Sequence, residues 1–416
     1  MSASEAFTPK LITLLRAGYT ADDLRADALA GLTVAIVALP LAMALGIASG
    51  ATPEKGIVTA IVAGFLISAL GGSRVQIGGP TGAFVVVITG IIAVHGLDGL
   101  ILATLMGGVI LLAAGVLRLG DLMRFVPPPV IIGFTAGIAI IIATSQLKDF
   151  FGLAVPKLPG DVIGQWRELA AAADTTQWPT LAVSAGTLGL ILALRRWAPK
   201  LPAFLIALGL AATAVALLDL PVATIGARFP ALDTSFPAPA LPAISGDRLI
   251  TLLPAALTIA FLAGIESLLS AAVADGMTGF RHRSNLELLA QGAGNIGSAL
   301  FGGLPATGAI ARTATNIRSG ARSPVAGMIH AVLLLVFLLV AGDLMRLAPM
   351  PALAAVLLLV AWGMSESRHF AQLHTMPRAD AALLLLTFVL TIAVDLTAAI
   401  VAGVGLSLLL RRFGKT

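Results

Sequence analysis

The chain has 416 residues, of which 58% are hydrophobic and 11% are charged, and its mean hydropathy is +1.00. Soluble proteins carry about a quarter charged residues, so this composition excludes a soluble globular protein and indicates an integral membrane protein. The net charge of +5 comes from basic residues in short loops between apolar runs, which indicates membrane topology rather than nucleic-acid binding. The absence of cysteine excludes disulfides and thiolate metal sites.

Hydrophobic segments follow one another after an N-terminal segment, residues 1–27, that lacks the basic flank and cleavage site of a signal peptide. Such runs fit helices, because a helix of about 20 apolar residues crosses a membrane and satisfies its own backbone groups there. We therefore predict an all-α membrane protein with 14 transmembrane segments. They are 28–48, 53–71, 81–94, 97–117, 125–146, 178–195, 200–218, 248–272, 286–301, 307–317, 324–342, 348–364, 380–394 and 396–411.

The loops after even-numbered segments are basic, from Arg74 to the arginines near the end of the chain. By the positive-inside rule both termini are then cytoplasmic, in a membrane that we expect to be a bacterial plasma (inner) membrane. Residues 8–18 are predicted to form a short amphipathic helix on the cytoplasmic surface. The proline-rich stretch 219–247 is an external connector between two halves, 28–218 and 248–416. Because seven segments per half is an odd number, we predict a 7+7 inverted repeat.

A short motif occurs once in each half, as GGPTGAFVV at 78–86 and as GGLPATGAIA at 302–311. Each motif falls in the third segment of its half, and both segments are too short to cross a membrane alone. Because proline removes a backbone donor and glycine weakens a helix, we predict half-helices at segments 3 and 10. Their N-termini would meet near the midplane and bind an anion through free N–H groups. Alternatively, the glycines only permit close helix packing.

Two charged residues lie inside the predicted membrane region, Glu266 in segment 8 and Arg312 in segment 10. A charge there costs about 2.5–3.5 kcal/mol on insertion scales, so each residue needs a partner or a watery cavity. In one interpretation they form a structural ion pair. In the other, both are coupling residues: Arg312 adds positive potential to the anion site, and Glu266 releases or takes up a proton as the site loads. The candidate substrate-binding residues are thus Thr81, Gly82, Ala83, Phe84, Thr307, Gly308, Ala309, Ile310 and Arg312.

The stretch 264–327, which begins GIESLLSAAVADG and contains the second motif, resembles the sulfate permease (SulP) anion transporters, the family of the animal anion exchangers and prestin. GGSRVQIGGPTGAFVVV and VALPLAMALGIASG resemble the third and first spans of that family. The resemblance implies a core domain, about 28–120 and 248–346, moving against a gate domain, about 121–218 and 347–412. It also implies an anion site between half-helices 3 and 10, with an arginine at the place of Arg312.

Two features depart from that family. Its members normally continue into a cytoplasmic STAS domain, which we expect to be absent here because the chain stops at Thr416. Many members also have a glutamine after the proline of the first span, where this chain has Leu41. We include Leu41 among the substrate-binding candidates, because the missing side-chain donor affects which anion is bound.

The predicted function is secondary-active transport of sulfate, bicarbonate or a small carboxylate, by proton-coupled symport and elevator-like alternating access. The alternatives are a nucleobase permease of the same architecture and a passive anion channel or exchanger. An enzyme is not expected, because no paired carboxylates, metal cluster or Ser/His set lies in the apolar segments. Expected partners are the anion, a proton or sodium ion, membrane lipid and a second copy in a homodimer, with no cofactor, metal or nucleic acid.

Overall fold

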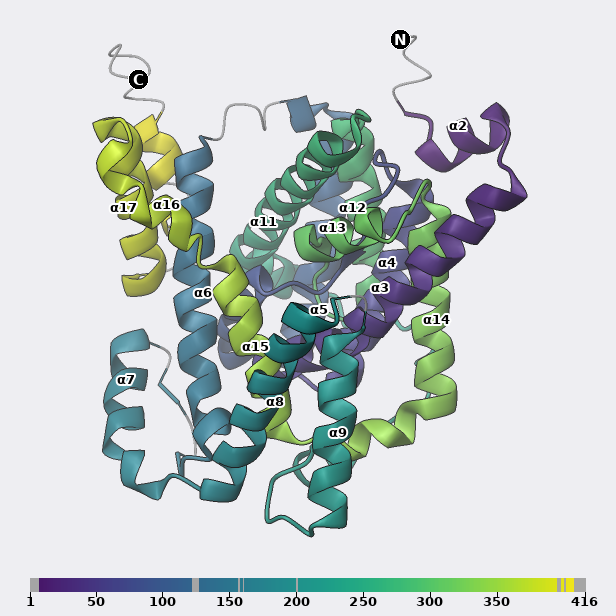
Figure 1. Cartoon of the computed structure of the whole chain (residues 1–416). Coiled ribbons are helices and arrows are strands. Elements are labelled where there is room, and N and C mark those ends of the chain that lie inside the picture. The colour runs from purple at the N-terminus through teal and green to yellow at the C-terminus, as the bar shows by residue number, and fades with distance from the viewer. Residues whose placement is uncertain are drawn as a thin grey trace.

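The computed structural model describes residues 7–121, 127–155, 158–159, 161–199, 201–394, 398–399 and 402–407. Its regular structure is almost entirely helical (Figure 1), which confirms the predicted all-α class. The predicted segments of the first half correspond to α3 (Ala21–Ala48), α4 (Pro53–Leu70), α5 (Ala83–Val116), α6 (Pro128–Phe151), α8 (Trp178–Trp197) and α9 (Ala203–Leu217). Those of the second half correspond to α11 (Gly246–Thr278), α12 (Ser284–Leu300), α13 (Ile310–Arg318), α14 (Val325–Ala341), α15 (Met350–Met364) and α17 (Arg378–Ala393). Half of the last predicted segment, 396–411, lies outside the described residues, and its described stretch 402–407 is helical.

Among the segment boundaries that differ from the prediction, two have a clear local reason. α3 begins at Ala21, seven residues before the predicted start, because Thr20 and Asp23 form a reciprocal capping box at its N-terminus. The predicted segments 81–94 and 97–117 fall almost entirely within α5, which is interrupted at Gly96 with φ 68° and ψ 180°. That left-handed φ suits glycine, so Gly96 marks the break between the half-helix and the segment that follows it.

Shorter elements connect the long helices. They are α2 (Lys10–Ala17), α7 (Val162–Ala171), α10 (Ile225–Arg228), α16 (Ser367–Ala371) and the 3-10 turns η2 (Ala173–Thr175), η3 (Gly342–Leu347) and η4 (Leu373–Thr375). α2 confirms the helix predicted at 8–18. The connector 219–247 contains α10 and bridges back to the second half, where Thr224 pairs with Pro349.

Both repeated motifs are extended just before their helices begin. β1 (Gly78–Gly79) and β2 (Thr307–Gly308) pair antiparallel, with Gly78 opposite Gly308 and Gly79 opposite Thr307. After these strands α5 starts at Ala83 and α13, which is 9 residues long, starts at Ile310. The strand pairing therefore brings the N-termini of the two predicted half-helices together.

The long helices form two groups, which stand side by side in Figure 1. The first group consists of α3, α4, α5, α11, α12, α13 and α14, and the second of α6, α8, α9, α15 and α17. Small residues let the first group pack tightly. A Cβ at Gly56 of α4 would lie 1.8 Å from the carbonyl oxygen of Ala42 in α3, and Gly108 faces Gly292 where α5 crosses α12. This packing fixes the backbones on which both motifs are mounted.

Candidate anion-binding site

The second motif is held in place by side chains from three neighbouring helices. Asn295 of α12 donates to the carbonyl oxygen of Ala306 and accepts from its amide, each at 2.9 Å. Thr59 of α4 accepts from the amide of Leu304 at 2.6 Å, and Ser267 of α11 accepts from that of Gly308 at 2.9 Å. These bonds replace the helical hydrogen bonds that an extended segment lacks inside a membrane. The N-terminus of α13 is therefore rigidly placed.

The first motif is held near its start in a similar way, but its tip depends on two charged residues. The hydroxyl of Thr313 accepts from the amide of Ile77 at 3.1 Å. At the tip, Arg312 of α13 donates from Nη2 to the carbonyl oxygen of Pro80, and Thr81 donates from Oγ1 to Oε2 of Glu266 at 2.9 Å. The start of α5 is thus tied to α13 by Arg312 and to α11 by Glu266.

The two helix tips carry backbone donors without acceptors. Within the described residues, the amides of Gly82 and Ala83 at α5 and of Ile310 and Ala311 at α13 donate to no protein atom. Such amides carry the positive end of the helix dipole. Two convergent sets of them form a place where negative charge is stabilised.

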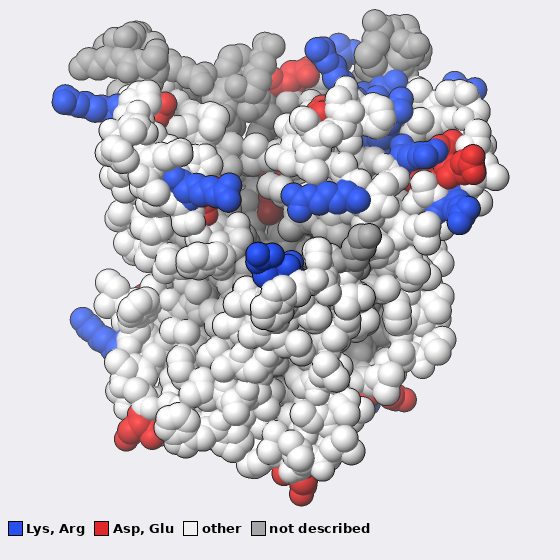
Figure 2. Space-filling model, viewed as in Figure 1, with Lys and Arg blue, Asp and Glu red and all other residues white. Residues whose placement is uncertain are grey.

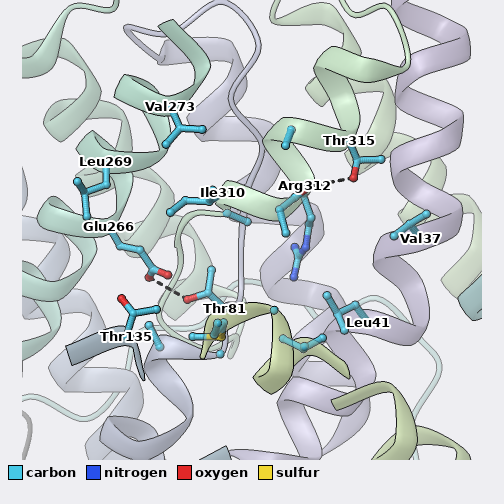
Figure 3. A pocket seen from close by; sticks show the side chains of 18 of the residues that line it. Val37, Leu41, Thr81, Thr135, Glu266, Leu269, Val273, Ile310, Arg312 and Thr315 are labelled. Carbon is cyan, nitrogen blue, oxygen red and sulfur yellow. Dashed lines mark hydrogen bonds between the residues drawn. The ribbon is translucent and has the colours of Figure 1, made fainter. Parts of the chain in front are cut away.

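Arg312 adds a full positive charge to these tips. Its side chain is 3% exposed, and its Nε and Nη1 groups have no hydrogen-bond partner in the described part of the chain. Figure 3 shows Thr81 between Arg312 and Glu266, and no ion pair joins the two charged residues among those described. The structural ion pair considered from the sequence is therefore not formed, because each charged group bonds to the tip of α5 instead.

A cavity of about 1670 Å³ lies between the two groups of helices, with the tips in its wall. The second group contributes Thr135 of α6, Phe204 of α9 and Met364 of α15 to the lining. Its lining also includes Arg195 from the last turn of α8 and Arg318 from the end of α13, together with Asp121 and Glu366. Figure 2 shows a hollow with Lys and Arg side chains on several sides of it. The cavity is therefore lined by charges of both signs, with basic side chains on several sides of the hollow.

The cavity brings most of the predicted site residues together. Its lining includes Leu41, Thr81, Gly82, Ala83, Glu266, Ala309, Ile310 and Arg312. Phe84, Thr307 and Gly308 do not line the cavity, and their assignment to the site stays a prediction. Phe84 is fully buried in the apolar core, so the tips offer no aromatic ring for stacking a nucleobase.

Thr307 and Gly308 lie behind the tip of α13. The hydroxyl of Thr307 is bonded to Ser267 and to the carbonyl oxygen of Ala263. A Cβ at Gly308 would lie 1.7 Å from Nε2 of Gln76, which itself donates to the carbonyl oxygen of Ser267 at 3.1 Å. The sequence analysis missed this supporting role of Gln76 and Ser267, although a glutamine among the apolar residues before the first motif was a signal for it.

Residues from the second group of helices were also missed. A Cβ at Gly82 would lie 2.9 Å from Sδ of Met364 and 3.0 Å from Cδ1 of Ile142, so both side chains pack over the tip of α5. Because both are apolar residues in apolar helices, the sequence gives no signal that they pack over this tip. Chemically, the site combines backbone amides, a guanidinium and a carboxylate beside apolar walls. Within the described residues, no group of His, Asp and Glu side chains is arranged to hold a metal ion.

Comparisons with known proteins agree with this geometry. The profile of the Sulfate permease family matches residues 24–387. The chain is 44% identical to the putative sulfate transporter YvdB of Bacillus subtilis, over 93% of this chain and 73% of that protein. It is 33% identical to the bicarbonate transporter BicA of Picosynechococcus, over 92% of this chain and 69% of that protein.

Two solved structures are similar to the whole arrangement. The transmembrane domain of a cyanobacterial bicarbonate transporter BicA has a TM-score of 0.83 at 34% identity, covering 92% of this chain and 98% of that chain. The murine Slc26a9 anion transporter in the inward-facing state has a TM-score of 0.89 at 17% identity, covering 100% of this chain and 72% of that chain. The latter identity is low, so this likeness concerns the fold.

Proposed function

The chain belongs to the sulfate permease family, whose members are transporters and not enzymes, and we propose that it works as a proton-coupled symporter. Its family makes it an integral membrane anion transporter. In this proposal a small anion binds between the tips of α5 and α13. Sulfate, bicarbonate and small carboxylates are the candidate substrates. The relatives named for sulfate and bicarbonate support these classes.

The observation that carries the proposal is the state of Arg312. A buried guanidinium with two unpartnered N–H groups costs several kcal/mol unless something else satisfies it. An anion in the cavity can accept from these groups and from the free amides at the two tips. Charge-assisted hydrogen bonds of this kind are about twice as strong as neutral ones. A single buried cation beside the apolar side chain of Leu41 favours a singly charged anion, so we rank bicarbonate and monocarboxylates above sulfate.

Coupling to protons is assigned to Glu266. Among the described residues, Thr81 is the hydrogen-bond partner of its carboxylate, and the carboxylate lies at the cavity wall. When Glu266 takes up a proton, the negative charge that competes with the anion for the tip of α5 is removed. A proton and a monoanion then cross together without net charge, which avoids about 2.3 kcal/mol for each charge moved across 100 mV.

Movement between the two helix groups would provide alternating access. We assign the first group to the core domain, about 28–120 and 248–346, and the second to the gate domain, about 121–218 and 347–412. Met364 and Ile142 of the gate cover the tip of α5, while the cavity extends to Arg195 and Arg318 at the basic ends of α8 and α13. If basic ends are cytoplasmic, this is the inward-open state, with both chain termini in the cytoplasm of a bacterium.

The test is uptake into proteoliposomes across a panel of anions, with and without proton and sodium gradients. Glu266→Gln imitates the protonated carboxyl, so it should exchange anions in counterflow but lose accumulation on a pH gradient. Glu168→Gln, at an exposed position in α7, is the matched control and should behave like the wild type. Accumulation by Glu266→Gln on a pH gradient would exclude Glu266 as the coupling acid. Accumulation by the wild type on a sodium gradient alone would exclude proton symport.

A further inference from the structure

Three cations come together where α2 meets the ends of α4 and α12. The backbone amide of Lys10, the first residue of α2, donates to the carbonyl oxygen of Gly71 at 3.1 Å. Arg74, in the loop after α4, lies over the ring of Phe280 with its Cζ 4.2 Å from the ring centroid. Arg283, just before α12, donates from Nη1 to the carbonyl oxygen of Thr8 and, at 3.2 Å, to the hydroxyl of Thr13. We call these three residues the basic cluster.

The nearby carboxylates do not neutralise this cluster. Asp275 accepts from the amide of His282 at 3.0 Å and contacts its Nδ1 at 2.7 Å. Glu287 is fully buried and accepts from the amides of Gly72 and Ser73 and from Gln291. Within the described residues, no ion pair involves Lys10, Arg74 or Arg283. The cluster therefore has positive charge in excess.

Burial, and then the charges of Arg283 and Arg74, lower the pKa of Lys10 below its ordinary value, while Asp275 acts in the opposite direction. The three side chains are half-buried rather than extended into water. Like charges held in this way repel one another unless an anion lies among them. Arg283 also has a buried Nε without a partner among the described residues.

The surroundings of the cluster indicate which anion fits. On the same amphipathic helix as Lys10, the side chains of Ile12 and Leu15 are 38% and 53% exposed, on its outward face. Figure 2 shows Lys and Arg side chains gathered at the end of the molecule where α2 lies. An amphipathic helix with apolar residues beside basic ones is typical of the membrane interface, where phosphate headgroups lie above acyl chains.

We propose that Lys10, Arg74 and Arg283 form a binding site for the phosphate of an anionic membrane phospholipid. The phosphate oxygens accept from the ammonium and guanidinium groups, and the acyl chains lie against Ile12 and Leu15. The bound lipid ties α2 to the ends of α4 and α12, which carry Thr59 and Asn295, two of the side chains that hold the second motif. None of the three side chains lines the transport cavity, and the test measures unfolding rather than transport, so it does not depend on the transported anion.

The test compares the thermal unfolding of the purified full chain in nanodiscs of phosphatidylcholine with increasing fractions of phosphatidylglycerol. We expect phosphatidylglycerol to raise the unfolding midpoint of the wild type. In the double variant Lys10→Gln, Arg74→Gln its apparent affinity should be at least about tenfold weaker, a difference of roughly 1.4 kcal/mol. Arg378→Gln, an exposed arginine at the start of α17, is the control and should keep the wild-type response.

Two further measurements distinguish a lipid phosphate from free phosphate, and loss of the site from loss of folding. The charge-conserving variant Lys10→Arg, Arg74→Lys should retain the lipid response, which keeps the test valid if the double glutamine variant does not fold. Inorganic phosphate in phosphatidylcholine nanodiscs should protect little. Equal protection by inorganic phosphate would overturn the assignment to a lipid. An equal loss in Arg378→Gln would show general attraction to a negative surface and overturn the site itself.

Discussion

Equivalent glycines in the two motifs are expected to respond differently to the same substitution. In Gly308→Ala the new methyl would lie 1.7 Å from Nε2 of Gln76 and 3.1 Å from Cα of Ser267. Gln76 would have to leave its place and lose its hydrogen bond to Ser267. Overpacking costs about 1–3 kcal/mol, and an unpaired buried amide costs about 1–3 kcal/mol more. We expect Gly308→Ala to be destabilised by about 2–6 kcal/mol on these two counts.

In Gly82→Ala the obstacles are the outer atoms of Met364 and Ile142, at 2.9 and 3.0 Å from the new methyl. Met364 is flexible and Gly82 has a right-handed helical backbone, so the cost should be near the lower limit, about 1 kcal/mol. The methyl would instead crowd the free amides of the tip. Loss of one charge-assisted hydrogen bond, about 1.5–3 kcal/mol, corresponds to roughly ten- to a hundredfold weaker anion binding.

The assay combines thermal unfolding of both purified variants in detergent with anion uptake in proteoliposomes, normalised to folded protein. Gly308→Ala should lose stability, and Gly82→Ala should lose apparent affinity while unfolding close to the wild-type temperature. The reasoning is refuted if Gly308→Ala unfolds like the wild type, or if Gly82→Ala transports with unchanged affinity. The second result would mean that the amides of α5 do not contact the anion.

Three other predictions follow from single contacts. Leu41→Gln adds a donor at the cavity wall and should shift anion preference in competition uptake toward more strongly hydrated oxyanions, whereas an unchanged order would remove Leu41 from the site. Asn295→Leu leaves the amide and carbonyl of Ala306 unpaired and should lower stability by about 2–5 kcal/mol, and a wild-type unfolding temperature would contradict this. Burial and the bond to Asp27 raise the pKa of Tyr19, so its stabilisation should be complete below the ordinary pKa of about 10 and lost as pH rises through the higher folded value. The advantage of the wild type over Tyr19→Phe in unfolding temperature should therefore shrink at alkaline pH, and a constant difference would argue against this.

The sequence predicted those parts of the fold that depend on composition and chain periodicity. Apolar runs and basic loops gave the segments, and the repeated glycines and prolines located the half-helices at α5 and α13. These features are local, because an extended break in an apolar segment needs only a few residues. The start of α3 was placed late, because the capping box of Thr20 and Asp23 extends the helix into a stretch that hydropathy alone treats as polar.

The sequence did not predict which individual motif residues face the cavity. Which residues of an extended strand face a cavity depends on what packs behind it, and here Gln76 and Ser267 come from parts of the chain far from Gly308. For the same reason, an ion pair between Glu266 and Arg312 could be considered from the sequence only because their charges are opposite. Their actual partners, Thr81 and the carbonyl of Pro80, follow from the position of the α5 tip and not from any pattern in the sequence.

The pairing of the two motifs also affects how the protein is made. Arg312 reaches the Pro80 carbonyl across a separation of 232 residues, and β1 meets β2 over a similar distance. At about 5–20 residues per second, a ribosome needs on the order of ten to fifty seconds to synthesise the stretch between them. During that time the nascent first half has an unpaired strand edge in the bilayer, where exposed backbone groups cost several kcal/mol each. The first half cannot form this pairing by itself, so its tertiary structure is completed only after the second motif has been synthesised.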